Sequence, residues 1–290
     1  MDMENAIKVE HLSKSYPGFA LRDLTFSIPR GCIVGLIGEN GAGKTTTLHA
    51  ILGLVRADEG RIELLGVPYD PRNPALRRRI GVVFEDCGFP PHLTCRSVDR
   101  MLQRLYRGLW DADAFAGYCR RFNLPGDKEL RNFSRGMKTK LSIAAALAHH
   151  PELLILDEPT GGLDPIVREE ILDLFSEFIQ DERNSILFST HITTDLEKIA
   201  DEILFLHEGR LILSGSKDEL IYDHAVARCT SAQFADIAPE EYLRRRRLPG
   251  GGEELLVDNR QQFALRHPGV VLDRAGIDEI MLFYVKGEEK

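Results

Sequence analysis

The sequence predicts an α/β protein built on a largely parallel sheet with helices on both faces. Continuous apolar runs at residues 32–37, 153–156 and 185–188 have the composition of strands that are buried on both sides. Helical spacing of apolar residues separates them, most clearly at residues 171–178. Strands that alternate with helices in this way favour parallel pairing with helical crossovers.

The first part of the chain predicts short strands followed by a glycine-rich loop. Residues 7–16 form a strand pattern that ends at the turn Pro17-Gly18, and residues 20–28 alternate in polarity like a half-buried strand. The apolar run at 32–37 then leads into a glycine-rich segment and a helix over about 44–54. Further strands are predicted at 61–65 and 80–84.

The middle of the chain changes to helical spacing. Residues 87–133 predict an inserted helical subdomain, and residues 136–149 predict a helix. The buried strand at 153–156 runs into Asp157-Glu158, and Asp164-Pro165 has the form of a helix cap followed by proline at the first helical position. Residues 203–206 and 211–213 predict a hairpin around Glu208-Gly209.

The character of the sequence shifts again after Ser214. Residues 226–290 contain a flexible break, Pro249-Gly250-Gly251-Gly252, and a final helical stretch at 277–285, which predicts a small α+β appendage. We interpret the four arginines at 244–247 as a solvated helix face rather than as a lipid or phosphate patch.

Composition excludes several classes of function. The 290 residues are 43% hydrophobic and 28% charged, as expected for a globular protein. A net charge of −8 argues against nucleic-acid binding as the main task. The chain shows neither a secretory signal nor a membrane-spanning run, so a cytoplasmic location is expected. Its five cysteines form no Cys-x-x-Cys pair, which disfavours a disulfide or metal framework.

The segment at 38–45, Gly-Glu-Asn-Gly-Ala-Gly-Lys-Thr, is the strongest functional signal. Glycines allow backbone N–H groups to converge on phosphate oxygens, and the following helix directs its positive end at the same anion. Lys44 is expected to reach the β- and γ-phosphates, and Thr45 to bind Mg²⁺. The strand before this segment and the helix after it argue against a glycine-rich turn that arose by chance.

Three further polar residues follow buried strands. Asp157 ends one strand and is suited to hold Mg²⁺ through water, while Glu158 is suited to polarise an attacking water. His191 follows the next strand and is placed to contact the γ-phosphate. His149 and His150 at a helix end are interpreted as cations that suit the helix dipole, without a catalytic role.

In residues 5–220 the chain resembles an ATP-binding-cassette (ABC) ATPase, the nucleotide-binding subunit of ABC transporters. The resemblance is specific because several motifs occur in the family's order. The matching segments are 38–45 (Walker A), Phe133-Ser134-Arg135-Gly136-Met137 (signature), 153–158 (Walker B), Gly162-Leu163-Asp164 (D-loop) and His191 (switch histidine).

This resemblance implies roles for individual residues, with ATP and Mg²⁺ as cofactors. Nucleotide binding falls to Tyr16, which would stack on adenine, and to Gly38, Glu39, Asn40, Gly41, Ala42, Gly43, Lys44, Thr45 and Thr46. Catalysis falls to Glu158, His191 and Glu85, and Mg²⁺ binding to Thr45, Glu85 and Asp157. Contacts across a dimer fall to Ser134, Arg135, Gly136, Met137 and Asp164.

Two positions depart from the family pattern. Glu85 stands where the family has a glutamine that senses Mg²⁺ and the membrane domain. In the signature, usually Leu-Ser-Gly-Gly-Gln, Arg135 replaces a glycine and Met137 replaces a glutamine. Hydrolysis is expected to persist at a lower rate, because Lys44, Asp157, Glu158 and His191 are intact.

The resemblance also implies an architecture and partners. The expected fold is a P-loop NTPase cassette over 1–222, with an antiparallel β subdomain, a helical subdomain at about 87–135, and an appendage at 223–290. Two cassettes, as a homodimer or with a sister ATPase, would close around ATP and drive export through integral-membrane permease subunits. The protein would then be peripheral on the inner face of the membrane. The cassette is most similar to bacterial exporters of antibiotics, lantibiotics and other peptides.

Three alternative functions match the sequence less well. An ABC ATPase of translation or DNA repair is disfavoured because the chain has neither a second cassette nor a long coiled-coil insert. A regulatory module that binds ATP without hydrolysis is favoured only by the degenerate signature. A GTPase or kinase does not account for the signature, D-loop and histidine together.

Overall fold

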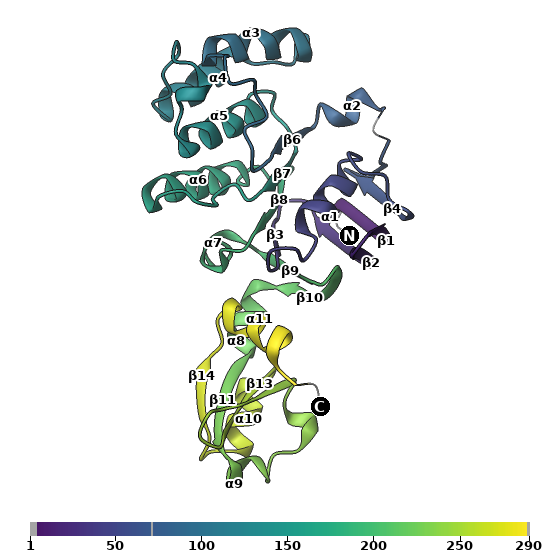
Figure 1. Ribbon diagram of the computed structural model, residues 1–290, viewed down its shortest axis with the longest axis vertical. Helices are drawn as coiled ribbons and strands as arrows, with labels where there is room; N and C mark the ends of the chain where they lie inside the picture. The colour runs from purple at the N-terminus through teal and green to yellow at the C-terminus, as the bar shows by residue number, and fades with distance from the viewer. Residues whose placement is uncertain (1–4, 71, 289–290) are drawn as a thin grey trace.

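The computed structural model describes residues 5–70 and 72–288, and its centre is a six-stranded sheet of order β10-β9-β3-β8-β7-β6 (Figure 1). Five of these strands are parallel, and β10 joins as the antiparallel arm of a hairpin with β9. The predicted parallel α/β sheet is therefore confirmed. The strands are β3 (Ile33–Ile37), β6 (Ile80–Val83), β7 (Leu153–Asp157), β8 (Ser185–Thr190), β9 (Glu202–His207) and β10 (Arg210–Ser216).

Alternate residues of these strands are buried on opposite faces of the sheet. Leu154 and Phe188 pack in one core with three helices, whereas Leu153 and Leu187 pack in another core with α1 and the N-terminal sheet. Because both faces are covered, the strands read as continuous apolar runs. The covering helices are α1 (Lys44–Ile51) on one face and α5 (Arg135–Leu147), α6 (Pro165–Phe178) and α7 (Thr193–Ile199) on the other.

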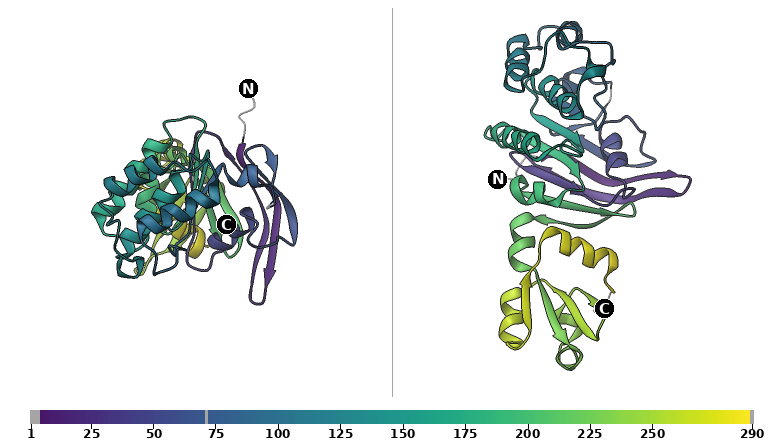
Figure 2. Two further views of the ribbon diagram at one scale, coloured as in Figure 1. Left: turned by 90° about the horizontal axis from the view of Figure 1, so that it is seen from above. Right: turned by 60° about the vertical axis from the view of Figure 1, so that its left-hand side comes forward.

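A second sheet, antiparallel and of order β2-β1-β4-β5, packs against the α1 side of the central sheet. Its long strands β1 and β2 extend beside the core in Figure 2. Gly209, in the turn between β9 and β10, packs directly on this sheet: a Cβ there would lie 1.8 Å from the carbonyl oxygen of Ala20. The strands are β1 (Asn5–Tyr16), β2 (Phe19–Pro29), β4 (Glu59–Leu64) and β5 (Val67–Pro68).

The predicted helical insert contains two helices that pack on α5. Thr94 and Asp111 cap them, each accepting a hydrogen bond from a backbone N–H three residues on. Trp110 donates to Asp99 and packs against the core of this region. The helices are α3 (Cys95–Tyr106) and α4 (Ala112–Arg121), preceded by the short α2 (Pro74–Arg77).

The C-terminal part contains a four-stranded antiparallel sheet of order β12-β13-β11-β14, at the lower end of the molecule in Figure 1. The predicted final helix is present as α11, and its Phe283 packs in the same core as Phe205 of the central sheet. The elements are α8 (Lys217–Asp223), β11 (Ala225–Thr230), α9 (Ser231–Phe234), β12 (Arg244–Arg247), β13 (Gly252–Val257), α10 (Arg260–Arg266), β14 (Val271–Arg274) and α11 (Ile277–Lys286).

The four arginines at 244–247 are a strand, so their interpretation as a solvated helix face was wrong. They form β12, which pairs with β13. Arg246 donates to Glu254 at 2.7 Å, and its guanidinium lies 4.3 Å from the ring centroid of Phe283. The carboxylates and rings of neighbouring elements compensate the clustered charge, which periodicity within one segment does not reveal.

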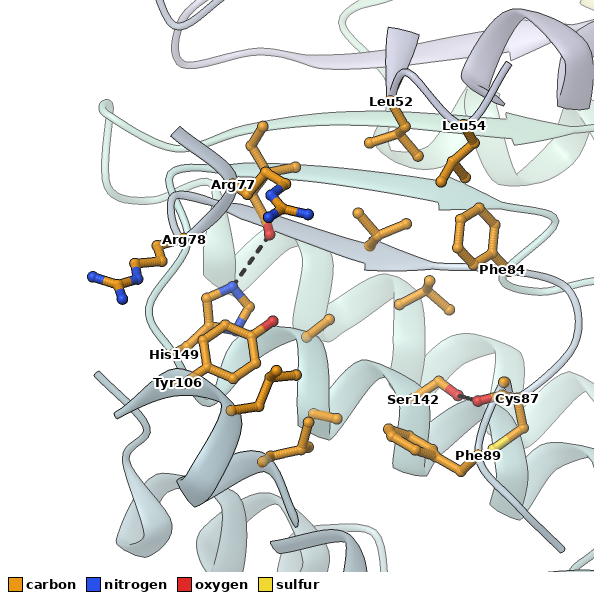
Figure 3. A pocket seen from close by; sticks show the side chains of 18 of the residues that line it. Leu52, Leu54, Arg77, Arg78, Phe84, Cys87, Phe89, Tyr106, Ser142 and His149 are labelled. Atoms are coloured by element: carbon orange, nitrogen blue, oxygen red, sulfur yellow. Dashed lines mark hydrogen bonds between the residues drawn. The ribbon is translucent and has the colours of Figure 1, made fainter. Parts of the chain in front are cut away.

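A groove of about 670 Å³ opens where β6 meets the helical insert (Figure 3). Its walls are mainly apolar and include Leu54, Phe84 and Leu105, and Arg77 and Arg78 also line it. Leu54 and Leu105 are 60% and 69% exposed, large values for leucine side chains. Among the helices of the described residues, none has the length and apolar character needed to cross a membrane.

Candidate nucleotide site

The loop after β3 places Lys44 at the centre of the site. The Lys44 ammonium donates to the carbonyl oxygens of Gly38 and Glu39, at 2.8 and 3.3 Å, and only 7% of its side chain is exposed. Gly43 has a φ of +111°, and a Cβ there would meet Phe19 and Leu21 at 2.7 Å. Glycine is therefore required at this position both by backbone conformation and by close packing.

The remaining loop residues surround this lysine at the start of α1. Thr47, which the sequence analysis did not single out, donates its hydroxyl to the carbonyl oxygen of Gly43 at 2.9 Å. Among the predicted loop residues, Gly38, Ala42 and Gly43 are buried, Thr46 is half-buried, and Glu39, Asn40, Gly41 and Thr45 are exposed.

Thr45 and Asp157 meet across the gap between α1 and β7. The Thr45 hydroxyl donates to Asp157 at 2.9 Å, and the Ser189 hydroxyl donates to the other carboxylate oxygen at 2.5 Å. Ser189 holds Asp157 in position and was not predicted as a site residue. Only the pairing register of β7 and β8 identifies Ser189 as a site residue, because that register places it beside Asp157.

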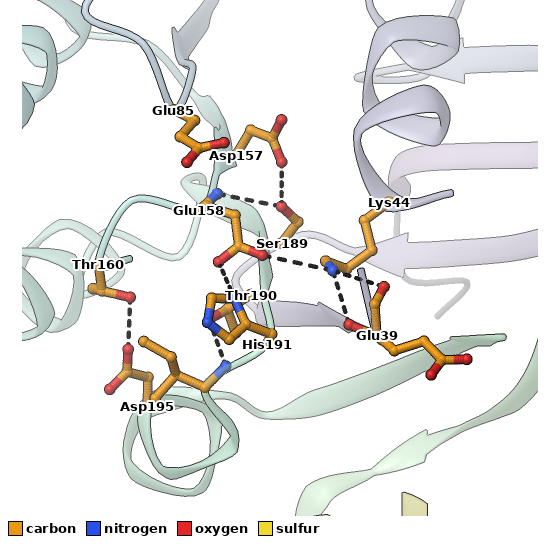
Figure 4. Close-up of polar contacts among 12 residues, drawn as sticks. Glu39, Lys44, Glu85, Asp157, Glu158, Thr160, Ser189, Thr190, His191 and Asp195 are labelled. Carbon is orange, nitrogen blue, oxygen red and sulfur yellow. Dashed lines mark hydrogen bonds and ion pairs between the residues drawn. The ribbon is translucent and has the colours of Figure 1, made fainter. Parts of the chain in front are cut away.

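Glu158 lies between the side chains of Lys44 and His191 (Figure 4). Its carboxylate is 3.6 Å from the Lys44 ammonium and 2.9 Å from Nδ1 of His191, and 13% of its side chain is exposed. Glu158 also has a φ of +49°, a left-handed conformation that is rare outside glycine and concentrates at functional sites. The Glu158 carboxylate therefore lies beside the glycine-rich loop, and the arrangement can orient and deprotonate a water.

The predicted signature and D-loop residues lie outside this cluster. Ser134 is exposed and caps α5 by accepting from the Met137 N–H at 3.2 Å, and the Asp164 carboxylate caps α6. Gly136 packs near Val167. Among the described residues, none of these side chains forms a hydrogen bond or ion pair with Lys44 of the same chain.

The two departures from the family pattern contact each other. The Arg135 guanidinium donates to the Glu85 carboxylate at 3.0 Å, and both side chains are more than half exposed. The guanidinium also lies against Gly162, where a Cβ would be 2.7 Å from Arg135 Nη1. Arg135 therefore links the loop after β6 to the loop after β7.

Tyr16 lies at the end of β1 and is 41% exposed. The Lys14 ammonium sits 5.5 Å from the centroid of its ring. An exposed ring at this strand end is available for stacking on a planar group.

His149 differs from its predicted description. It is buried, stacks on Tyr106 with centroids 4.5 Å apart, and its Nε2 is 3.2 Å from the carbonyl oxygen of Ile80. Burial lowers its pKa, so the interpretation as a cation at a helix end was wrong. His150 pairs with Asp111 at 3.0 Å on the surface.

A buried polar pair supports the loop that follows Glu158. The Thr160 hydroxyl donates to Asp195 at 2.6 Å, and both residues are almost fully buried. Burial is the main cause of the raised pKa of the Asp195 carboxyl. This pair connects the loop after β7 to α7, the helix that follows His191.

Comparisons with known proteins agree with this arrangement. The ABC transporter family profile matches residues 21–161. The bacitracin transport ATP-binding protein BcrA of Bacillus licheniformis is 36% identical over 229 residues, which are 78% of this chain and 73% of BcrA. The ABC transporter ATP-binding protein YtrB of Bacillus subtilis is 29% identical over 98% of this chain and 88% of YtrB.

Solved structures show the same fold. A structure of the ATP-binding subunit of an ABC transporter aligns with a TM-score of 0.68 and 33% identity, over 74% of this chain and 91% of the other. The chain belongs to the ABC transporter family of ATP-binding proteins and is an ATPase of the transport type.

Proposed function

We propose that this member of the ABC transporter family hydrolyses ATP with Glu158 as the residue that polarises the attacking water. The observation that carries the proposal is the cluster of Lys44, Glu158 and His191 beside the Thr45–Asp157 contact. Lys44 would exchange the loop carbonyls for the β- and γ-phosphates when ATP binds. His191 would hold the Glu158 carboxylate and contact the γ-phosphate.

The residues present fit a magnesium ion. Mg²⁺ prefers oxygen ligands and keeps several waters, so one hydroxyl and one carboxylate from the protein suffice. Thr45 supplies the hydroxyl and Asp157 supplies the carboxylate, and these two groups lie 2.9 Å apart. Glu85 follows β6, the strand next to β7. When bound, the ion would neutralise charge on the phosphate oxygens. Ser189 fixes the carboxylate for this task.

We further propose that two such cassettes close head to tail around ATP. Ser134, Arg135, Gly162 and Asp164 are exposed on one chain, which suits residues that also meet the nucleotide of a second copy. The start of α5 would offer its N–H groups and positive dipole end to phosphate. ATP then favours the closed state by binding it better than the open state.

The groove of Figure 3 is the proposed docking site for a permease subunit. The occupant we propose is a short amphipathic helix from the cytoplasmic side of an integral-membrane partner. Its apolar face would cover Leu54 and Leu105, and acidic side chains would meet Arg77 and Arg78, which are exposed. Exposed apolar surface of this kind marks interaction sites.

Transport by this complex is proposed to be export, with the ATPase peripheral on the inner face of the membrane. BcrA is named for bacitracin transport, and we extend that class of cargo, an antibiotic or other peptide, to this chain as a proposal. The proposed division is a cassette at 1–222, with its helical subdomain at about 87–135, and an appendage at 223–290. The separate sheet β12-β13-β11-β14 and its own small core support this boundary.

Glu158→Gln tests the catalytic and closure proposals together. The variant should bind ATP, release phosphate about 10²–10⁴-fold more slowly than wild type, and accumulate as a dimer in ATP. Phosphate release and light scattering are the measurements. A variant that stays monomeric at saturating ATP contradicts the closure model. Wild-type protein that binds ATP with Mg²⁺ and releases no phosphate would instead indicate the regulatory alternative.

The docking proposal is tested with Leu105→Asp, and Leu265→Asp is the matched control. Leu265 is 84% exposed on α10, far from the groove in sequence and fold. The Leu105 variant should lose recovery of a membrane protein from detergent extracts, and the Leu265 variant should retain it. Equal recovery by both variants would contradict docking in the groove.

A further inference from the structure

The ion pair between Glu85 and Arg135 joins residues that are 50 positions apart in sequence. Glu85 lies after β6, beside β7 and its terminal Asp157. Arg135 is the first residue of α5. A cation at a helix N-terminus is unfavourable to the helix dipole, so its presence there calls for a compensating anion. Glu85 is that anion.

Arg135 is held on its other side by the loop after β7. A Cβ on Gly162 would lie 2.7 Å from Nη1 and 3.1 Å from Cζ of Arg135. The guanidinium therefore packs directly over this glycine. Gly161 is also close, with a virtual Cβ 3.6 Å from Nη2 and 3.4 Å from the carbonyl oxygen of Glu158. The position of one guanidinium is therefore defined both by Glu85 and by the loop that carries Glu158.

We propose that Glu85 and Arg135 act as one neutral unit, in which Arg135 is a positioning residue for the carboxylate of Glu85. A free carboxylate beside the phosphate site repels ATP, and a free guanidinium attracts it. Together they cancel, so a charged pair occupies positions where related cassettes carry an amide and a glycine. The inference rests on the proposed function in one respect, the assignment of the 38–46 loop as the nucleotide site.

What this unit supplies is the cancellation of two opposite charges beside the phosphate site, rather than stability of the fold. Both side chains are more than half exposed, and exposed ion pairs contribute little to stability. A merely structural tether predicts that breaking the pair from either side has the same effect. A neutral unit predicts opposite effects, because the two substitutions leave residual charges of opposite sign.

The test is equilibrium binding of ATP to the full chain in EDTA, where Glu85 cannot act through a metal ion. Arg135→Ala should weaken ATP binding by about three- to tenfold, and Glu85→Gln should tighten it by a similar factor, as expected for charges near the phosphates. The double variant should bind within about twofold of wild type. Arg135→Lys, which keeps the charge, should bind more like wild type than Arg135→Ala does.

Salt dependence and a control pair separate this proposal from other effects. The opposite shifts should shrink between 0.1 M and 1 M salt, where the screening length falls from about 10 Å to about 3 Å. Arg121→Ala and Glu177→Gln break an ion pair of similar exposure between α4 and α6 and should leave ATP affinity unchanged.

Shifts of the same sign for Glu85→Gln and Arg135→Ala, or no shift in either, would overturn the proposal. Equal shifts in the Arg121 and Glu177 controls would also overturn it, because the effect would then not depend on the position of the pair. Wild-type protein that fails to bind ATP would contradict the nucleotide-site assignment itself, and that outcome is distinct from the other two.

Discussion

Replacing Lys44 with alanine tests the centre of the site most directly. Its ammonium makes two hydrogen bonds to loop carbonyls and lies 3.6 Å from Glu158, while its side chain is 7% exposed. These partners are all within the chain and occupy the ammonium before any nucleotide arrives. On binding ATP, the ammonium is expected to transfer to phosphate oxygens, so the substitution removes a charge-assisted contact from the bound state.

The size of the effect follows from the contacts. Hydrogen bonds to charged groups are worth about 1.5–3 kcal/mol, and each 1.4 kcal/mol is tenfold in a dissociation constant, so ATP affinity should fall about 10- to 150-fold. Loss of the carbonyl contacts lowers the free energy of unfolding of the unliganded chain by a smaller amount, because water can solvate the exposed Glu39 side of the loop.

Isothermal titration calorimetry with ATP and Mg²⁺ measures the ATP affinity of wild-type protein and of Lys44→Ala. Lys198→Ala is the control, since Lys198 pairs with Glu169 on the surface of the α6–α7 region. Calorimetric unfolding without nucleotide confirms that both variants are folded at the assay temperature. An affinity of Lys44→Ala within threefold of wild type would refute the assignment of Lys44 to the phosphates.

Three further predictions concern the histidines and one glycine. His191→Ala removes the group 2.9 Å from Glu158 and should lower the rate of phosphate release about 10²–10⁴-fold with ATP affinity within threefold of wild type; an unchanged rate would contradict its role. Burial lowers the pKa of His149 and of His224, so the unfolded chain binds more protons as pH falls through the unfolded value of about 6.5. The free energy of unfolding should therefore fall between pH 7.5 and 5.5, by up to about 1.4 kcal/mol per pH unit for each histidine, and urea unfolding of His149→Gln should show a flatter slope than wild type. Gly209→Ala should cost about 2 kcal/mol or more, because its φ is +74° and a Cβ would overlap the carbonyl oxygen of Ala20; Gly18→Ala, with φ +84° and nothing within 4 Å, is the milder control, and equal urea midpoints for the two variants would contradict the steric argument.

Local sequence patterns predicted the elements of the cassette because a strand buried on both faces is apolar at nearly every position. The apolar runs around Ile37, Leu156 and Phe188 all became central parallel strands. The cap at Asp164 and the turn before β2 were also correct, since their chemistry acts over a few residues. The ends were less accurate: the helix predicted to reach residue 54 ends at Ile51.

Patterns failed where a segment's partners lie elsewhere in the chain. The arginines at 244–247 suggested a helix face, but they became a strand because β13 supplies hydrogen bonds and Glu253 and Glu254 supply charge. His149 suggested an exposed cation, but Tyr106 and the β6 backbone bury it.

The sequence by itself determined the glycine-rich loop at 38–45, the strand-end Asp157 and Glu158, and their order along the chain, because each depends on neighbours within a few positions. Only the tertiary structure decided that Ser189 holds Asp157, that Glu158 lies between Lys44 and His191, and that Glu85 and Arg135 are partners. Those contacts join residues 32 or more positions apart, and they form only when strand register and helix packing bring separate segments to one edge of the sheet.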